Sequence, residues 1–208
     1  AFDASVVHLD MHDVYGEVRT AVGKIDPDTQ KTFDQQVAMV NQAAGFNIDT
    51  DLLQTLGETI VTYRAPISDA AIAPAAVLIK LRDPKTFSAT LTKIEAKASA
   101  ALKAMPPSIP VAMSLESRDV PGVGPVMIFH TAQASVAWTV HGDYLCVSTS
   151  EALKPIVDQV DHGTSSILDN ADFARLYHAL PAGVSSVAFR DPAKSYPELY
   201  RVTQGLAM

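Results

Sequence analysis

Residues 135–150 read SVAWTVHGDYLCVSTS, and this stretch decides the class of fold. Two arms rich in β-branched and aromatic residues flank His141-Gly142-Asp143, which is the pattern of a β-hairpin. Strands that are joined by so short a turn run antiparallel. The stretch therefore predicts a sheet with antiparallel pairing rather than a doubly wound parallel sheet.

Strand and helix patterns follow one another on both sides of this hairpin. Further strands are predicted over residues 4–9, 58–65, 75–82, 111–117, 126–130 and 184–189. Apolar periodicity predicts helices over residues 14–25, 33–44, 51–56, 84–105, 173–180 and 192–203. One more is predicted after Ser150, in which Pro155 should cause a late start or a kink. Together these patterns predict an α+β fold with a curved, mostly antiparallel sheet and helices packed on it.

Composition bounds the size of the fold and the class of partner. The chain has 208 residues, 48% hydrophobic and 19% charged, so it can bury its own core. We predict a single domain over residues 1–208 and leave open a longer parent protein. The net charge of -7, with no Lys/Arg cluster, argues against nucleic acid and anionic membrane surfaces as partners. No apolar run approaches the roughly 18–20 residues of a transmembrane segment.

A strand, an aspartate and a helix recur as a unit along the chain. Residues 5–18 and 186–199 share serine, aspartate, tyrosine and glutamate at the same spacing, and residues 77–87 form a looser copy. An aspartate at a helix N-cap accepts hydrogen bonds from the first free backbone N–H groups, and proline is well tolerated directly after it. We predict that Asp10, Asp83 and Asp191 each cap a helix. We also expect strand 184–189 to join the sheet of strand 4–9, because an unpaired apolar strand is costly.

The first unit raises the question of a metal site. His8, Asp10 and His12 have the period-two spacing of one strand face. The copy at residues 186–199 keeps the aspartate but replaces both histidines, by Phe189 and Ala193. Capping by Asp10 would also end the strand before His12. We therefore predict a structural cap at Asp10 and no metal site.

Local motifs of catalysis and cofactor binding are absent from the sequence. It contains no GxSxG, GxGxxG, Walker loop or HExxH. Cys146, the only cysteine, lies in a hairpin arm and is expected to be a small buried side chain. His141 and His162 each precede a glycine and are expected in exposed turns. We expect no catalytic residue, no cofactor and no metal ligand, and we lean towards a protein that is not an enzyme.

Two long stretches carry a recurring order of strand, helix and capping residues: GDYLCVSTSEALKPIVDQV at residues 142–160 and SSILDNADFARLYHALPAGVSSVAFRDP at residues 165–192. They resemble a bacterial family of domains of unknown function, the one numbered thirty-three fifty-two. Upstream, residues 45–63 and 75–94 resemble the first part of that family, so the likeness covers roughly residues 45–205. Members are often exported, so the resemblance implies a periplasmic or otherwise extracytoplasmic protein. We also expect that an export signal preceded Ala1.

These observations lead to one expected function and two alternatives. The expected function is a non-catalytic extracytoplasmic module that binds or assembles with a protein or cell-envelope component. The first alternative is a hydrolase-type enzyme whose site is assembled from distant residues. The second is a metal-dependent module that uses His8 and His12. An exposed apolar patch would favour the binding module, and a deep pocket with converging aspartate and histidine would favour the enzyme.

Overall fold

The computed structural model of the chain describes residues 3–64, 75–105, 113–132, 134–149, 153–163, 169, 171–180 and 184–190. The strands are β1 (Asp3–His8), β2 (Leu56–Arg64), β3 (Ala75–Leu81), β4 (Ser114–Val120), β5 (Gly124–His130), β6 (Ser135–His141), β7 (Tyr144–Ser148) and β8 (Ser186–Arg190). The helices are α1 (Met11–Ile25), α2 (Pro27–Ala44), the short turns η1 (Ile48–Leu52) and η2 (Leu53–Thr55), α3 (Pro84–Ala104), α4 (Lys154–His162) and α5 (Ala171–His178).

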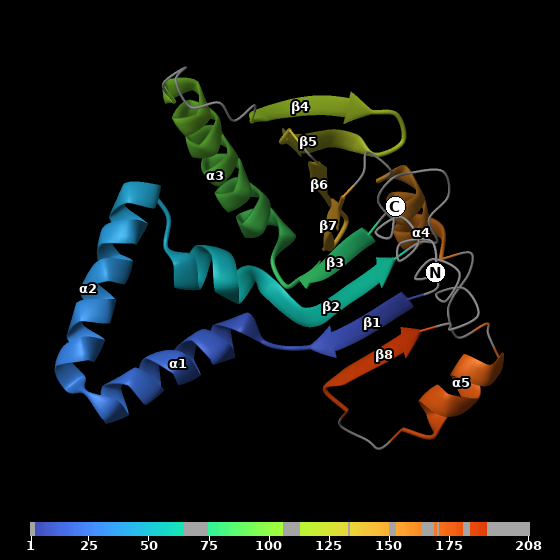
Figure 1. Cartoon of the computed structure of the whole chain (residues 1–208), viewed down its shortest axis with the longest axis horizontal. Helices are drawn as coiled ribbons and strands as arrows, with labels where there is room; N and C mark the ends of the chain where they lie inside the picture. The colour runs from blue at the N-terminus through green and yellow to red at the C-terminus, as the bar shows by residue number, and fades with distance from the viewer. Residues whose placement is uncertain are drawn as a thin grey trace, which may run out of the picture.

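The eight strands form one curved sheet in the order β4-β5-β6-β7-β3-β2-β1-β8 (Figure 1). Every neighbouring pair is antiparallel. The predicted α+β fold with an antiparallel sheet is therefore confirmed. The predicted hairpin is also present, because β6 and β7 pair from His141 opposite Tyr144 outwards. Its turn needs a left-handed residue, and Gly142 supplies it with a φ of 54°.

The main core lies between α4 and one face of the sheet. Ser148 of β7 lies opposite both Ala76 of β3 and Ala137 of β6, so these residues share one face of the sheet. Cys146, two residues before Ser148, lies on the same face. The buried cluster comprises Ala76, Val123, Val126, Ile128, Ala137, Cys146, Leu153, Ile156 and Val157. Cys146 is fully buried, as expected from the sequence, and burial raises the pKa of its thiol to about 11. The thiol is therefore protonated at neutral pH and is a packing group.

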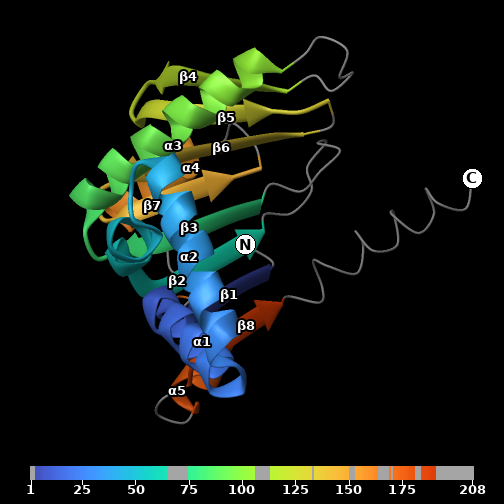
Figure 2. The ribbon, with the colours of Figure 1, turned by 90° about the vertical axis from the view of Figure 1, so that its left-hand side faces the viewer.

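Helix α3 covers the opposite face of the sheet, on the same side as α1 and α2 (Figure 2). The helix runs from Pro84 to Ala104, nearly as predicted, and it buries Phe87. Glu95, in its fourth turn, accepts a 2.8 Å hydrogen bond from the indole N–H of Trp138 on β6. This contact holds α3 across the central strands of the sheet.

Two of the three predicted aspartate caps are confirmed, and the third lies outside the described residues. Asp10 accepts hydrogen bonds from the backbone N–H groups of His12 (2.9 Å) and Asp13 (3.2 Å). Asp83 accepts from the backbone N–H of Thr86 at 3.0 Å. Asp191 and the predicted helix 192–203 are not among the described residues. Because β1 and β3 both run antiparallel to β2, the two confirmed caps lie at the same end of the sheet.

Several local predictions are wrong in position. The helix predicted at residues 51–56 begins at Ile48, where Asn47 caps it, and Gly57 lies within β2. A side chain at Gly57 would meet the carbonyl oxygen of Lys80 at 2.9 Å, so the glycine serves strand packing. Strand β4 extends three residues beyond the predicted end at residue 117.

The two histidines predicted in exposed turns differ in their surroundings. The prediction for His141 is wrong, because this residue ends β6 and its Nε2 lies 2.7 Å from an oxygen of Asp161. The turn needs only two residues, and these are Gly142 and Asp143. His162 is exposed at the end of α4. That helix begins at Lys154, so the delay expected from Pro155 is confirmed.

Strand β8 pairs with β1, as expected from the sequence, and places the terminal strand in the same sheet as the first. Phe189 of β8 packs edge-on against Phe173 of α5, with ring centroids 5.2 Å apart. Phe173 is buried, so it anchors α5 to this end of the sheet. That the whole chain folds as a single domain remains a prediction.

Substitution Phe173→Ala tests that prediction. Removing a buried phenylalanine should lower the free energy of unfolding by about 3 kcal/mol. The only tryptophan, Trp138, lies in β6, at the other side of the sheet. If the chain is one cooperative unit, urea unfolding followed by tryptophan fluorescence should shift by the same amount as unfolding followed by circular dichroism. A fluorescence transition that does not move would show that α5 and β8 unfold separately from the central strands.

Candidate functional site

Helices α1 and α2 form a hairpin that leads away from the sheet (Figure 1). The rings of Tyr15 and Phe33 lie 6.1 Å apart between the two helices. The guanidinium of Arg19 donates two hydrogen bonds, of 2.7 and 2.8 Å, to the carboxylate of Asp34. Planar two-point pairing of this kind fixes orientation as well as distance. The two helices are therefore held together by their own contacts.

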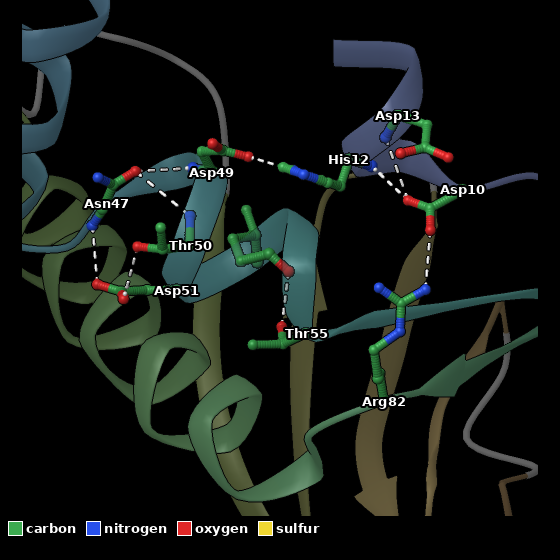
Figure 3. A network of polar contacts seen from close by, with 10 residues as sticks. Asp10, His12, Asp13, Asn47, Asp49, Thr50, Asp51, Thr55 and Arg82 are labelled. Atoms are coloured by element: carbon green, nitrogen blue, oxygen red, sulfur yellow. Dashed lines mark hydrogen bonds and ion pairs between the residues drawn. The ribbon is translucent and has the colours of Figure 1, made fainter. Parts of the chain in front are cut away.

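A network of polar side chains attaches the start of α1 to the sheet (Figure 3). The carboxylate of Asp10 caps α1 with one oxygen and accepts a 2.8 Å hydrogen bond from Arg82 with the other. Arg82 follows directly after β3 and also lies 3.5 Å from Glu58 of β2. The hydrogen bond from Arg82, followed by the backbone N–H of Asp13, lowers the pKa of Asp10. The cap is therefore also the link between α1 and β3.

A second contact in the network joins α1 to η1. Nδ1 of His12 lies 2.6 Å from an oxygen of Asp49 (Figure 3). Asp49 is held in place because the side chain of Asn47 accepts hydrogen bonds from its backbone N–H (2.9 Å) and from that of Thr50 (3.4 Å). The carboxylate of Asp51 in turn accepts a hydrogen bond from the backbone N–H of Asn47, which is the main cause of the lowered pKa of Asp51. The histidine therefore meets a preformed turn.

The end of α2 is also attached by polar groups. Lys97 of α3 donates a 2.6 Å hydrogen bond to the carbonyl of Ala43, and Lys93 donates one of 3.4 Å to the carbonyl of Gly45. Cations are favourable at a helix C-terminus, where the last carbonyl groups lack helical partners. Gly45 ends the helix in the left-handed region. Both ends of the hairpin are therefore tied to the body of the protein.

The hairpin exposes apolar side chains. No residue of α1 or α2 is buried. Most of the exposed large apolar residues in the described part of the chain belong to these two helices: Val14 (37% exposed), Val18 (50%), Ile25 (86%), Met39 (61%) and Val40 (50%). Exposed apolar surface on a folded protein marks interaction sites where it is contiguous, and these two packed helices carry most of it here. The hairpin is therefore the candidate functional site, and the polar network is its base.

The structure separates the three residues weighed as metal ligands. Nδ1 of His8 lies 3.3 Å from the hydroxyl of Thr59, whereas His12 contacts Asp49 and Asp10 contacts Arg82. Within the described ranges, no three His, Cys, Asp or Glu side chains are grouped so that they could hold a metal ion. The contacts of His12 and Arg82 were not predicted, since their partners lie 37 and 72 residues away and leave no local pattern.

A second polar cluster lies at the end of β5 and β6. Nδ1 of His130 lies 2.8 Å from the hydroxyl of Ser135, its direct cross-strand neighbour. Nε2 of His130 lies 3.3 Å from an oxygen of Glu116 on β4, and Arg118 donates to that same oxygen at 2.7 Å. No local sequence pattern predicts this cluster, because only strand register brings its members together.

A groove of about 270 Å³ lies between α3 and the strands β4, β5 and β6. Its walls include Leu91 and Glu95 of α3 together with Ser117, Met127 and Trp138 of the sheet. The carboxylate of Glu95 already receives the indole N–H of Trp138. Burying an indole N–H requires such a partner, so packing alone explains the polar group in this groove.

Comparison of the chain with protein-family models, with curated proteins and with solved structures found no match. The resemblance described above therefore remains a prediction. Of the helices that the structure describes, none has the length and apolar character needed to cross a membrane.

Substitution Asp10→Asn tests the polar base through its pH dependence. Asparagine caps helices about as well as aspartate, so the change mainly removes the ion pair with Arg82. The folded state lowers the pKa of Asp10, so its contribution is present above about pH 4 and is lost as the pH falls through the folded-state value. The variant should be less stable than the wild type at neutral pH, and the two should converge as the pH falls below the folded-state pKa of Asp10.

The measurement is the free energy of unfolding in urea across this pH range. The matched control is Asp143→Asn, which removes an exposed 3.0 Å ion pair with Lys80 that lies outside the α1–α2 hairpin. Parallel pH profiles for the wild type and Asp10→Asn would show that the carboxylate does not stabilise the hairpin base.

Proposed function

We propose that this protein is a non-catalytic binding or assembly module whose α1–α2 hairpin docks onto a protein or cell-envelope component. The observation that carries this proposal is the apolar surface of the hairpin, formed by Val14, Val18, Ile25, Met39 and Val40. Covering a valine or isoleucine side chain completely is worth about 1.5–3 kcal/mol. A partner that covers several of them gains that free energy on binding.

The polar base suits the hairpin to this role. Association costs less when the binding surface is already ordered. Asp10 and His12 fix the start of α1, and Lys97 fixes the end of α2. These contacts therefore hold the two helices in one orientation relative to the sheet, although no residue of either helix is buried.

The free edge at β4 is a poor alternative docking surface. This strand carries Glu116, Arg118 and Asp119, all of them exposed. Charged side chains on an edge strand oppose the addition of another strand. The helical hairpin is therefore the better candidate for partner binding.

The proposal includes an extracytoplasmic location, which rests on the resemblance to a family with many exported members. Protease treatment of intact cells that make the full-length protein tests it. The protein should be degraded once the outer barrier alone is opened. Protection until the cytoplasmic membrane is lysed would place it inside the cell.

A hydrolase is the second candidate function, because Ser135, His130 and Glu116 lie in hydrogen-bonding sequence. In serine hydrolases the acid orients the histidine and stabilises its charged form. Here Arg118 lies closer to the shared oxygen of Glu116 than His130 does, and it competes for that role. We therefore interpret the cluster as cross-strand pairing that stabilises β4, β5 and β6.

Fluorophosphonate labelling distinguishes the two candidate functions. We expect no label on the wild-type protein above the level of Ser135→Ala, because Arg118 competes with His130 for the carboxylate of Glu116 that would orient and charge-stabilise the histidine. Stoichiometric labelling that is lost in Ser135→Ala and in His130→Ala would favour the hydrolase.

Site-specific photo-crosslinking in cells tests the binding function. A benzophenone side chain at position 18 or 25 should form adducts, since these positions lie on the exposed apolar surface. The same group at position 13 or 20 of α1 is the control, because those residues are exposed but polar. Adducts of equal yield at all four positions, or at none, would contradict docking through this surface.

A further inference from the structure

Val14, Val18, Ala21 and Ile25 follow one another at intervals of four, three and four residues along α1. This spacing places them on one stripe of a helix, as in the seam of a coiled coil. All four are exposed. At 1.5 Å per residue, the stripe is about 16 Å long. We call these four residues the α1 stripe.

The two sides of the α1 stripe differ. Tyr15 and Arg19, which contact Phe33 and Asp34 of α2, show the side on which α2 lies. On a helical wheel, Glu17 and Lys24 border the stripe on the other side, and they lie about two helical turns apart. Both are exposed. Neither forms an ion pair with another residue in the part of the chain that the structure describes.

The α1 stripe is complementary to the same stripe of a second, antiparallel copy. Its spacing is symmetrical about the point midway between Val18 and Ala21. If the α1 helix of a second copy packs antiparallel against this stripe, Val14 of each copy lies opposite Ile25 of the other. Val18 of each copy then lies opposite Ala21 of the other. In the same arrangement Glu17 faces Lys24 of the second copy within one turn, and Lys24 faces Glu17. Two-fold contacts require this reciprocity, in which each residue of a pair appears once on either side.

We infer that the partner of the hairpin is a second copy of this chain, with the two α1 stripes packed antiparallel about a two-fold axis. This inference rests on the proposed docking function of the hairpin. The hairpin leads away from the sheet (Figure 1), so two copies can approach through α1. The two hairpins then form a four-helix arrangement. Reversed helix dipoles and two Glu17–Lys24 pairs set the antiparallel direction.

Charge reversal tests the direction of pairing. The wild-type protein should self-associate in sedimentation experiments between about 1 µM and 1 mM, the range of small interfaces. Glu17→Lys should weaken the dimer about tenfold, because both ion pairs become repulsive, and Lys24→Glu should do the same. The double variant should regain wild-type association. An equimolar mixture of the two single variants should form heterodimers more tightly than either variant forms homodimers.

A second pair of variants tests the stripe itself. Val18→Asp should abolish self-association, whereas Thr20→Asp, an exposed position off the stripe, should not. Circular dichroism must show both variants folded. A monomeric wild type over the whole range, or a double variant no tighter than the single ones, overturns the antiparallel dimer. If the wild type is monomeric while position 18 still crosslinks to a different protein in cells, the docking function stands and only the second copy is wrong.

Discussion

The carboxylate of Asp10 is the contact on which the placement of the hairpin depends. Asp10 is two residues beyond β1, and it closes the free N–H groups of α1 with one oxygen while it holds Arg82 with the other. Arg82 in turn precedes Asp83, the cap of α3. Because β1 and β3 run in the same direction on either side of β2, these caps lie together at one end of the sheet. One ion pair therefore links the starts of the two helices that lead away from this end.

The attachment of the hairpin reverses the usual arrangement of amphipathic helices. A surface helix normally turns its apolar stripe to the core and its charges to water. Here the contacts to the body are made by Asp10, His12 and the carbonyl groups at the end of α2, whereas Val18 and Ile25 face solvent. Polar contacts are directional, so they can hold a helix pair at a set angle without burying it. The apolar surface then stays free for a partner.

The copies of the unit of strand, aspartate and helix do not all occupy equivalent places in the sheet. The copies at Asp10 and Asp83 are equivalent in the sheet, because their strands are parallel to each other. The strand of the third copy, β8, pairs antiparallel with β1, and Arg190 lies beside Asp3 at the start of that strand. Its far end therefore lies at the opposite end of the sheet. Similar sequence predicts similar local structure, but it does not predict the direction in which a strand enters the sheet.

Local physics determined much of this protein from its sequence. The hairpin at residues 135–150, the caps at Asp10 and Asp83, the glycine at the end of α2 and the burial of Cys146 all follow from short-range preferences or from hydrophobicity. Only the tertiary structure decided that His12 meets Asp49, that Asp10 meets Arg82 and that the apolar residues of α1 face water. Each of these depends on strand register or on helix orientation, which are set by contacts between residues far apart in the chain. A stripe at helical spacing indicates a helix, and whether its partner is the core or another molecule depends on where the rest of the fold places it.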